Sequence, residues 1–490
     1  MCIRCCFFIE YCFTMKRLRP ACMRAAIVAL LVLAAAMGNA QSVRSTYFME
    51  GAQYRLQLNP ALAPERGYIN LPVIGHTEAS VRSNTMGLND VVDIIKNSDD
   101  ADYFTTDKFY GKLKDMNHAS ATAATDVIAA GFWHGKGFMS LNMTVKADGN
   151  LSVPREMFSF MRDMKGMNHN DYSNYLRDIN GGDLNVNVYT ELGFGYTRVI
   201  NDHVSLGGRI KGLLGHGNVS LKMEKAVIKT NLEGLDPDLD WTTADPIMLA
   251  KATGSASVDV KATLESSAHG LNYKLSRDGY IDDVEFKAGK MGVCGLGAAM
   301  DLGLEYSPND MFSLSAAVTD LGFIRWSKGN TVRAYSNTSD LNYDSNNPGD
   351  LMRFTDVVAT GKALNLDMMR LYIDEQEAKA RTTNITSTMA LGAECRLMEN
   401  RMHIGALFTN RFSKPENQSE LTFSFNYHPR SLLDFTLSYS PILCSGQSIG
   451  LAMKLGPLFI GTDYLYMGKN TKCCNALVGI SVPLGGRSFD

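Results

Sequence analysis

Apolar and polar residues alternate almost without interruption along the last third of the chain. Apolar side chains occupy every second position from Leu421 to Tyr427 and again from Leu433 to Tyr439, with polar residues between them. A period of two is typical of a β-strand with one apolar and one polar face. The same pattern recurs upstream, in the segments 184–196, 258–264, 296–306, 312–318, 385–397, 402–408 and 476–482. We therefore predict an all-β protein.

Strands of this kind are stable either in a soluble sandwich or in a closed barrel that faces lipid. Many segments reach the roughly 9–11 residues that a tilted strand needs to cross a bilayer, whereas soluble strands usually have roughly 5–6. The connections also alternate between short turns and long links, as they do in outer-membrane barrels. The short turns lie at 200–202, 308–310, 399–400, 428–431 and 455–457, and the long links at 327–383, 413–419, 441–447 and 467–475.

This alternation favours a transmembrane antiparallel β-barrel of about 14 strands, with 16 as the alternative, whose C-terminus lies in the periplasm. The two counts differ because of the region 215–290. Its strand-like segments, 217–230 and 254–266, fit either two barrel strands or an external hairpin.

Two stretches have apolar residues at helical spacing and predict small helices in the loops. Residues 154–164 carry Met157, Phe158 and Phe160 on such a stripe, and residues 362–380 are similarly rich in Leu and Met. Helices at the mouth of a barrel would suit both stretches. The alternative is a helix packed on a soluble sheet.

The N-terminus has the features of an export signal. Basic residues between 16 and 24 precede an apolar run over 25–37, and small residues end at Ala40. We expect cleavage after Ala40. Beyond it, no apolar stretch is long enough for a spanning helix, so a mature chain that crosses a membrane would cross as strands.

These features divide the chain into three parts. Residues 1–40 are the leader and signal peptide, in which 1–14 or 1–22 would be a mis-assigned start. Residues 41–66 read as an irregular N-terminal segment, and residues 67–490 as the barrel with its long external loops.

Charge and cysteine usage narrow the possible functions. The chain carries 48 basic and 51 acidic residues, and this balance lacks the basic excess of a nucleic-acid-binding protein. Five of the 10 cysteines precede the expected cleavage site, so an odd and scattered set remains, which is no disulfide framework. Cys444 could pair with Cys473, next to Cys474, but buried free thiols are an equally good interpretation.

The sequence contains no arrangement of residues that predicts an enzyme, a cofactor or a metal site. Residues 446–450 match the G-x-S-x-G nucleophile motif, but that motif needs a helix after it and here the strand pattern continues. The 9 histidines have no metal-binding spacing. The carboxylates on polar strand faces are candidate lumen residues, with solvated surface positions as the alternative: Glu191, Asp301, Glu305 and Glu394.

Two short motifs carry a family resemblance. They are Asn59-Pro60-Ala61 near the start, and Asp320-Leu321-Gly322-Phe323-Ile324-Arg325-Trp326 at the end of a long strand. With the closing strand 479–483, they resemble uncharacterised Bacteroidetes-type outer-membrane barrels of the FadL-like and PorV-like superfamily. The resemblance implies about 14 strands and an N-terminal plug that contains Asn59, Pro60 and Ala61. One departure is the C-terminus, which ends on Asp490 rather than on an aromatic residue.

Three functions fit these observations. The first is an outer-membrane barrel that binds or passes a small ligand, hydrophobic ligands included, captured by the apolar loop stretches. The second is a barrel that does not transport but serves as a scaffold for secretion or surface assembly. The third is a soluble exported β-sandwich. The partners would be outer-membrane lipid and either a hydrophobic small molecule or secretion-system proteins, with no nucleic acid.

Overall fold

The computed structural model describes residues 44–97, 101–166, 171–234, 252–345, 366–376, 378–413, 417–430, 433–443, 446–464 and 470–486. The expected signal peptide, the cleavage site after Ala40, Cys444 and the last residues of the chain lie outside these ranges. Among the described helices, none has the length and the apolar character that a membrane-spanning helix needs.

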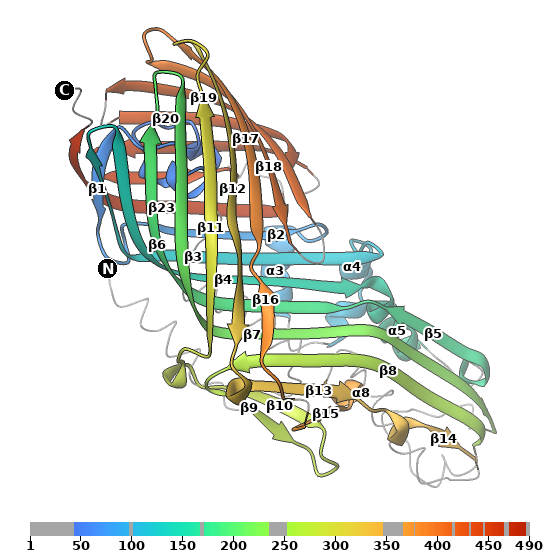
Figure 1. The fold of residues 1–490 in the computed structure, drawn as a ribbon. Coiled ribbons are helices and arrows are strands. Elements are labelled where there is room, and N and C mark those ends of the chain that lie inside the picture. The colour runs from blue at the N-terminus through green and yellow to red at the C-terminus, as the bar shows by residue number, and fades with distance from the viewer. Residues whose placement is uncertain are drawn as a thin grey trace, which may run out of the picture.

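Fourteen antiparallel strands close into a barrel, which confirms the predicted fold and the lower strand count (Figure 1). The first is split into β1 (Arg66–Asn70) and β2 (Thr77–Ser83), and both parts pair with β23 on one side and β3 on the other. The remaining strands follow in ring order: β3 (Met116–His134), β4 (Gly137–Pro154), β6 (Asp183–Val199), β7 (Val204–Glu233), β11 (Gly295–Tyr306), β12 (Phe312–Trp326), β17 (Ser387–Leu397), β18 (Met402–Phe412), β19 (Gln418–Arg430), β20 (Leu433–Leu443), β21 (Gly446–Leu455), β22 (Leu458–Thr462) and β23 (Cys473–Gly486).

The alternation of the sequence appears in the barrel wall as two chemically different faces. On β7, Ile210 is 67% exposed on the outside, whereas its neighbour Lys211 is 4% exposed on the inside. The outer surface carries a belt of large apolar side chains, among them Leu141, Leu192, Phe194, Ile210, Leu296, Met300, Leu302, Leu314, Phe323, Leu391, Ile404, Phe423, Leu437, Leu451 and Ile460. A closed barrel with such a belt matches the surface that a bilayer covers.

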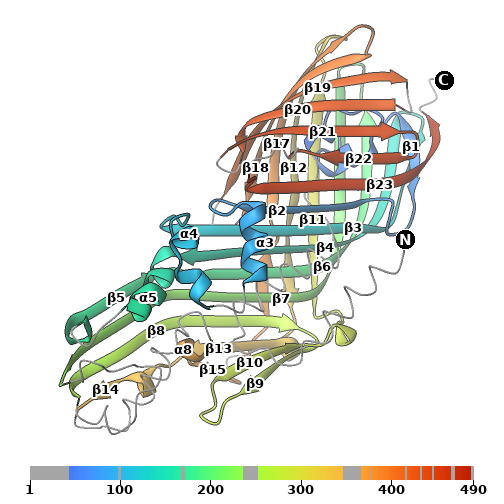
Figure 2. The ribbon, with the colours of Figure 1, turned by 180° about the vertical axis from the view of Figure 1, so that it is seen from behind.

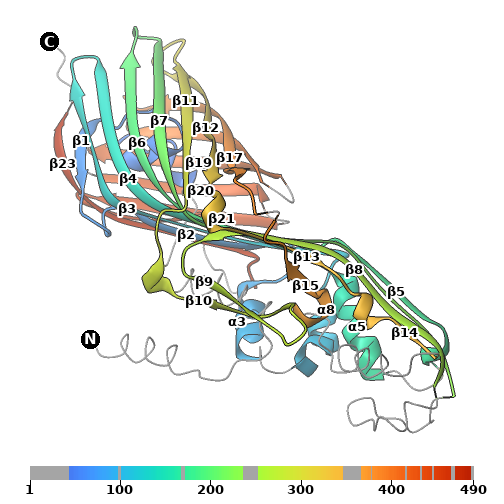
Figure 3. The ribbon, with the colours of Figure 1, turned by 60° about the horizontal axis from the view of Figure 1, so that its bottom comes forward.

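The doubtful region 215–290 forms an external hairpin rather than two barrel strands. Strand β7 has 30 residues, and its second half leaves the barrel and pairs with β8 (Thr253–Ala268). The result is a sheet that projects from the long-loop end, as Figure 3 shows. It is completed by β5 (Tyr175–Asn180), β13 (Thr331–Ser336), β14 (Tyr343–Asp344) and β15 (Leu371–Ile373).

Helices cover the face of this projecting sheet that continues the outer surface of the barrel (Figures 2 and 3). Val153 and Leu221, which extend the outward-facing rows of β4 and β7, pack against their apolar side chains. The helices are α3 (Leu88–Lys96), α4 (Asp107–Tyr110), α5 (Arg155–Gly166) and α8 (Leu366–Met369). Their apolar side chains and those of the sheet together form the largest buried core, so the helices shield this part of the outer strand face from solvent.

The helix predicted over 154–164 is present as α5, but the one predicted over 362–380 is mostly wrong. Within its described part, a single turn, α8, is followed at once by strand β15 and further on by β16 (Arg381–Asn384), which pairs with β12. The apolar residues there, such as Leu371, are buried in the core under the projecting sheet, so they need no helical face of their own.

The short elements complete the described chain. The N-terminal segment carries the 3₁₀ turns η1 (Arg44–Thr46) and η2 (Gln53–Gln57), and a separate hairpin consists of β9 (Leu271–Leu275) and β10 (Ile281–Phe286). The other 3₁₀ turns are η3 (Ala101–Thr105), η4 (Asp171–Asn174), η5 (Ala288–Lys290), η6 (Lys328–Asn330) and η7 (Ser339–Leu341).

A lysine on the apolar belt tests whether lipid covers it. We expect Ile210→Lys to lower the free energy of unfolding in lipid vesicles by about 2–4 kcal/mol, because the charge would lie at membrane depth. The matched control is Leu176→Lys on β5, at a position that is 63% exposed but lies on the projecting sheet. It should change stability by less than about 0.5 kcal/mol. Equal effects of the two substitutions, measured by urea titration, would contradict a lipid-facing belt.

Candidate functional site: the charged lumen

The N-terminal segment lies inside the barrel and runs from the loop ends of β19 and β22, which Arg44 contacts, to the short turn beside His428, which Glu65 contacts. Asp463, which follows β22, fixes its first turn by accepting hydrogen bonds from the Arg44 and Ser45 backbone N–H groups at 2.9 and 3.0 Å. The Ser45 hydroxyl donates a third hydrogen bond to Asp463 at 2.7 Å. The Arg44 side chain forms an ion pair with Glu420 of β19. These groups are all buried, so charge pairing ties the segment to two parts of the wall, β19 and the end of β22.

The residues Asn59, Pro60 and Ala61 make a turn that rests on the barrel wall. The Asn59 side chain accepts a hydrogen bond from the Ala61 backbone N–H at 2.9 Å and donates one to the Tyr47 hydroxyl at 3.0 Å. Such a local side-chain bond is typical of an Asx turn, and the proline fixes its bend. Glycines in the wall leave room for this turn, because a Cβ on Gly207 or Gly303 would collide with its residues.

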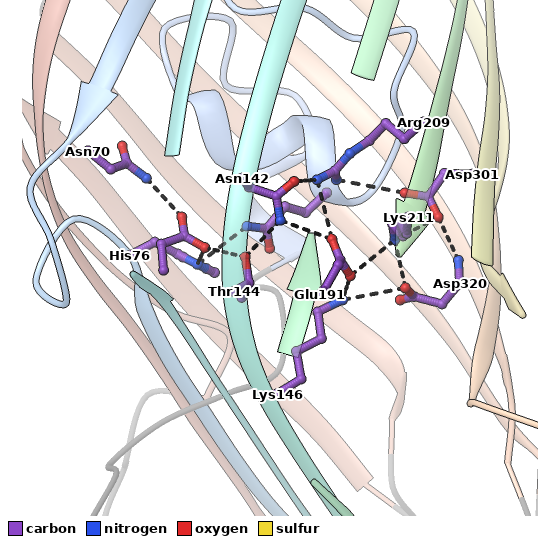
Figure 4. A network of polar contacts seen from close by, with 12 residues as sticks. Asn70, His76, Asn142, Thr144, Lys146, Glu191, Arg209, Lys211, Asp301 and Asp320 are labelled. Carbon is purple, nitrogen blue, oxygen red and sulfur yellow. Dashed lines mark hydrogen bonds and ion pairs between the residues drawn. The ribbon is translucent and has the colours of Figure 1, made fainter. Parts of the chain in front are cut away.

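Three cations and three anions form a compact network in the middle of the lumen (Figure 4). Lys146 pairs with Glu191 at 2.7 Å. Lys211 lies 2.7 Å from Asp301 and 2.6 Å from Asp320. Arg209 lies 3.5 Å from Glu191 and 3.7 Å from Asp301, which completes the set. The six side chains come from five adjacent strands, β4, β6, β7, β11 and β12.

A β-bulge brings Asp320 into this network. The pairing of β11 with β12 shifts register between Met300 and Leu302, so that Asp301 faces an extra residue on β12. Asp320 has a φ of 58°, in the left-handed region that Asp tolerates better than most residues, and its N–H donates to Asp301 at 2.7 Å. The bulge turns the Asp320 carboxylate towards the lysines, as bulges commonly re-aim a side chain.

The rest of the strand-end motif serves packing. A Cβ on Gly322 would collide with the backbone of Ala298 and Ala299, so glycine permits close strand pairing there. Leu321 is exposed on the outer belt. Trp326 is fully buried, and its indole N–H donates to the Thr383 hydroxyl at 2.8 Å.

Hydrogen bonds extend the network as far as the N-terminal segment. Asn142 joins Glu191 to Thr144, with its amide donating at 3.0 and 2.8 Å. The Thr144 hydroxyl then donates to Asp126 at 2.7 Å. Asp126 also accepts from Asn70 at 2.9 Å, and Asn70 in turn accepts from Gln53 of the segment at 3.1 Å. One chain of polar contacts therefore connects Glu191 on β6 with Gln53 of the N-terminal segment.

The other two carboxylates predicted to face the lumen, Glu305 and Glu394, lie in a separate cluster near the short turns. Arg396 pairs with them at 3.0 and 3.2 Å and with Glu50 at 3.6 Å. Glu50, Glu394 and His403 lie close enough together to be considered as ligands of a metal ion. However, Arg396 supplies the positive charge, and both ring nitrogens of His403 bond to protein oxygens at 2.9 and 3.0 Å, so the donor set suits an ion-pair cluster better.

The lumen encloses a cavity of about 140 Å³ between the N-terminal segment and the projecting sheet. Charged and hydroxyl-bearing side chains dominate its lining: Arg44, Glu78, Thr122, Thr144, Lys146, Asp148, Tyr189, Glu191, Arg209, Lys211, Thr319, Asp320, Thr386, Thr388, Thr409 and Arg411. Sequence reasoning selected only the carboxylates. The basic residues occupy the same polar rows of their strands, and that periodicity could have identified them.

Two sequence features have a plain structural explanation. The G-x-S-x-G match at 446–450 begins strand β21, which β22 follows, so the strand–turn–helix context of a nucleophile elbow is not formed there. Cys473 is a buried free thiol at the start of β23 and Cys474 is also free, which agrees with the free-thiol alternative, whereas Cys444 lies outside the described residues.

The buried network predicts a large cost for removing one partner. Asp301→Ala should lower the free energy of unfolding in vesicles by about 3–5 kcal/mol, because Lys211 and Arg209 lose a buried counter-charge. The control is Glu224→Ala, which removes an exposed carboxylate paired with Lys261 on the projecting sheet and should cause no measurable loss. Urea titration checks both. A small effect of Asp301→Ala would show that water or rearrangement replaces the missing charge.

Comparisons with known proteins give one family and several distant folds. Among curated proteins, none matches the chain. A deletion mutant of the monoaromatic hydrocarbon channel TodX is 11% identical with a TM-score of 0.40, covering 88% of this chain and 94% of that one. A Pseudomonas aeruginosa FadL homologue has 9% identity and a TM-score of 0.36, with 88% and 91% covered. The Ralstonia pickettii toluene transporter TbuX has 8% identity and a TM-score of 0.30, with 89% and 94% covered.

The family match is more extensive. The model of DUF5723, described as a family of unknown function, matches residues 60–463, from the Pro60 turn to the aspartate that anchors the N-terminal segment. That range contains the central lumen network, all of the second cluster except Glu50, and most of the barrel wall. The chain therefore belongs to the DUF5723 family.

Proposed function

We propose that this chain is an outer-membrane β-barrel that binds a small ligand in its lumen and passes it inward. The observation that carries the proposal is the lumen cavity, about 140 Å³ in volume and lined by charged and hydroxyl groups, above the N-terminal segment. A barrel that served only as a wall could fill this space with apolar side chains. Here the wall instead positions many polar groups around one space.

The orientation follows from the two ends of the barrel. Outer-membrane barrels have short turns in the periplasm and long loops outside. By that rule the projecting sheet lies outside the cell and the short turn that the N-terminal segment reaches lies at the periplasmic end. An export signal before Ala40, as the sequence predicts, fits this localisation.

In this proposal the N-terminal segment acts as a plug. It lies between the cavity and the short-turn end and is held by buried contacts of Arg44, Ser45 and Asn59, so a ligand that leaves the cavity inward must displace it. Binding outside and release inside would then be separated by one movable segment, without any change in the strands.

A hydrophobic ligand has a different place to bind. A groove of about 760 Å³ lies on the outer belt, with Gly212 at a gap among large apolar residues. Its other lining residues include Leu192, Phe194, Ile210, Met300, Leu321 and Phe323. Lipid or a hydrophobic small molecule fits such a surface. By contrast, the expected capture surface at 154–164 has little free apolar area, because Met157, Phe158 and Phe160 are buried in the core.

A scaffold for secretion-system proteins is the second candidate, and the projecting sheet favours it. One face of that sheet is covered by helices, whereas the other presents exposed charged residues such as Lys229, Asp259 and Lys261. Partners that co-purify after cross-linking, and are lost when Asp259 and Lys261 are both changed to alanine, would support this candidate.

Fractionation of cell envelopes tests the proposed function first. We expect extraction only with detergent, and a band that migrates differently on a gel with and without boiling, because closed barrels resist unfolding until heated. Recovery of the protein in the soluble periplasmic fraction would contradict the proposal.

The plug is tested by loosening its anchor. Asp463→Ala should raise the conductance of the barrel in planar bilayers, because the Arg44–Ser45 turn loses three hydrogen bonds. The control is Asp259→Ala on the projecting sheet, which should conduct like the unmodified protein. An unchanged conductance of the Asp463 variant, with its heat-shifted band intact, would show that this anchor does not hold the lumen closed.

A further inference from the structure

We propose that the lumen cavity is a binding site for a small zwitterion of amino-acid size. Its anionic group would be held by Arg411 with the hydroxyls of Thr388 and Thr319, and its ammonium group by Asp148. This inference rests on the proposed function, since it names the ligand class of the same lumen site.

Two charged residues that line the cavity have no ion-pair partner among the described residues, whereas the other charged residues of its lining are paired. The network neutralises Lys146, Arg209 and Lys211 against Glu191, Asp301 and Asp320. Arg44 and Glu78 are also in ion pairs, with Glu420 and His76. Within the described part of the chain, neither Arg411 nor Asp148 has an ion-pair partner, although both line the cavity. One unpaired cation and one unpaired anion match the two charges of a zwitterion.

The register of three neighbouring strands brings together the residues that would bind the anionic group of the ligand. Thr319 of β12 lies directly across from Thr388 of β17, and Thr388 lies directly across from Arg411 of β18. Directly opposed residues have Cβ atoms about 4.5–5.5 Å apart, so these three side chains form one row on the inner wall. A guanidinium beside two hydroxyls offers several hydrogen-bond donors to a carboxylate, and the guanidinium can bind it bidentately.

Asp148, the residue that would bind the ammonium group, is held in place by amide side chains. Both carboxylate oxygens of Asp148 accept weak hydrogen bonds from the Asn187 amide at 3.2 Å, and Asn187 itself bonds to Asn185 and Asn218 at 3.0 and 2.6 Å. These contacts fix the carboxylate, and among the described residues no cation lies within 4 Å of it, so the charges of Arg411 and Lys146 act on it only from a greater distance. An ammonium group is a compact donor of three hydrogen bonds and suits this position.

The size and chemistry of the cavity argue against a long hydrocarbon. A space of about 140 Å³ suits an amino acid or a dipeptide. An acyl chain placed there would remove water from the unpaired Arg411 and Asp148 without replacing their hydrogen bonds, and such desolvation of charged groups is costly.

Equilibrium dialysis with the full-length barrel in detergent tests the assignment. The probes are radiolabelled L-serine and glycylglycine, compared with acetate, which carries only the negative charge, and with laurate. We expect saturable binding of at least one zwitterion, and tighter binding of that zwitterion than of acetate. Saturable binding of laurate without binding of either zwitterion at about 10 mM would overturn the proposal, and so would the absence of all binding.

Two variants then locate the site. Arg411→Met and Asp148→Asn should each weaken zwitterion binding about 10-fold or more, since each removes a charge-assisted hydrogen bond. The control Arg401→Met, in a short turn, should bind normally, and a heat-shifted band confirms that each variant is folded. Unchanged binding by both lumen variants would overturn the site. Binding and transport are tested separately. A barrel that binds serine but carries no solute in liposome-swelling assays would contradict the proposed function and leave the binding site intact.

Discussion

The charges of the central lumen network must neutralise one another, because they are removed from water: Lys211, Glu191 and Asp301 are at most 4% exposed. Burying an ion without a partner costs several kcal/mol, whereas a well-arranged set of opposite charges recovers most of that cost. Lys211 illustrates the constraint, since it is almost fully buried and lies within 4 Å of three carboxylates. The bulge at Asp320 supplies one of these carboxylates, so a local irregularity of the backbone serves the electrostatics of the whole lumen.

The same constraint explains how the N-terminal segment is held. A segment that lies inside a polar lumen cannot rely on apolar packing alone, and its anchors are correspondingly charged or hydrogen-bonded, at Arg44, Ser45 and Asn59. Glycines such as Gly207 and Gly303 leave the wall thin where the segment passes. Apolar packing adds to these anchors, because Tyr47, Met49 and Leu56 are buried in clusters with residues of the wall.

The architecture could be predicted from the sequence because the period-two pattern reports directly which face of each strand meets an apolar environment. The strand count remained open only where β7 runs on past the barrel, since an extended strand outside the membrane alternates like one inside it. The helix predicted over 362–380 is mostly wrong because residues such as Leu371 are buried beneath a sheet, and a short buried strand can have the same apolar spacing as a helical stripe.

The candidate site was only half visible in the sequence. Glu191 and Asp301 stood out as carboxylates on polar strand faces, but nothing in the spacing showed that they meet Asp320, from a separate motif, around Lys211. That meeting depends on the register of five strands and on one bulge, which are properties of the closed sheet. Glu305 and Glu394 have the same sequence pattern and lie in a different cluster, with Arg396.

The central claim is that mutual neutralisation of the lumen charges stabilises the barrel, and a double-mutant cycle on Lys211 and Asp301 tests it most directly. The free energies of unfolding in vesicles would be measured for Lys211→Met, Asp301→Leu, the double variant and the unmodified protein. The account predicts that the double variant loses less free energy of unfolding than the two single variants lose together. The difference, the coupling energy, should be about 1–3 kcal/mol. Additive effects, within about 0.5 kcal/mol, would contradict it.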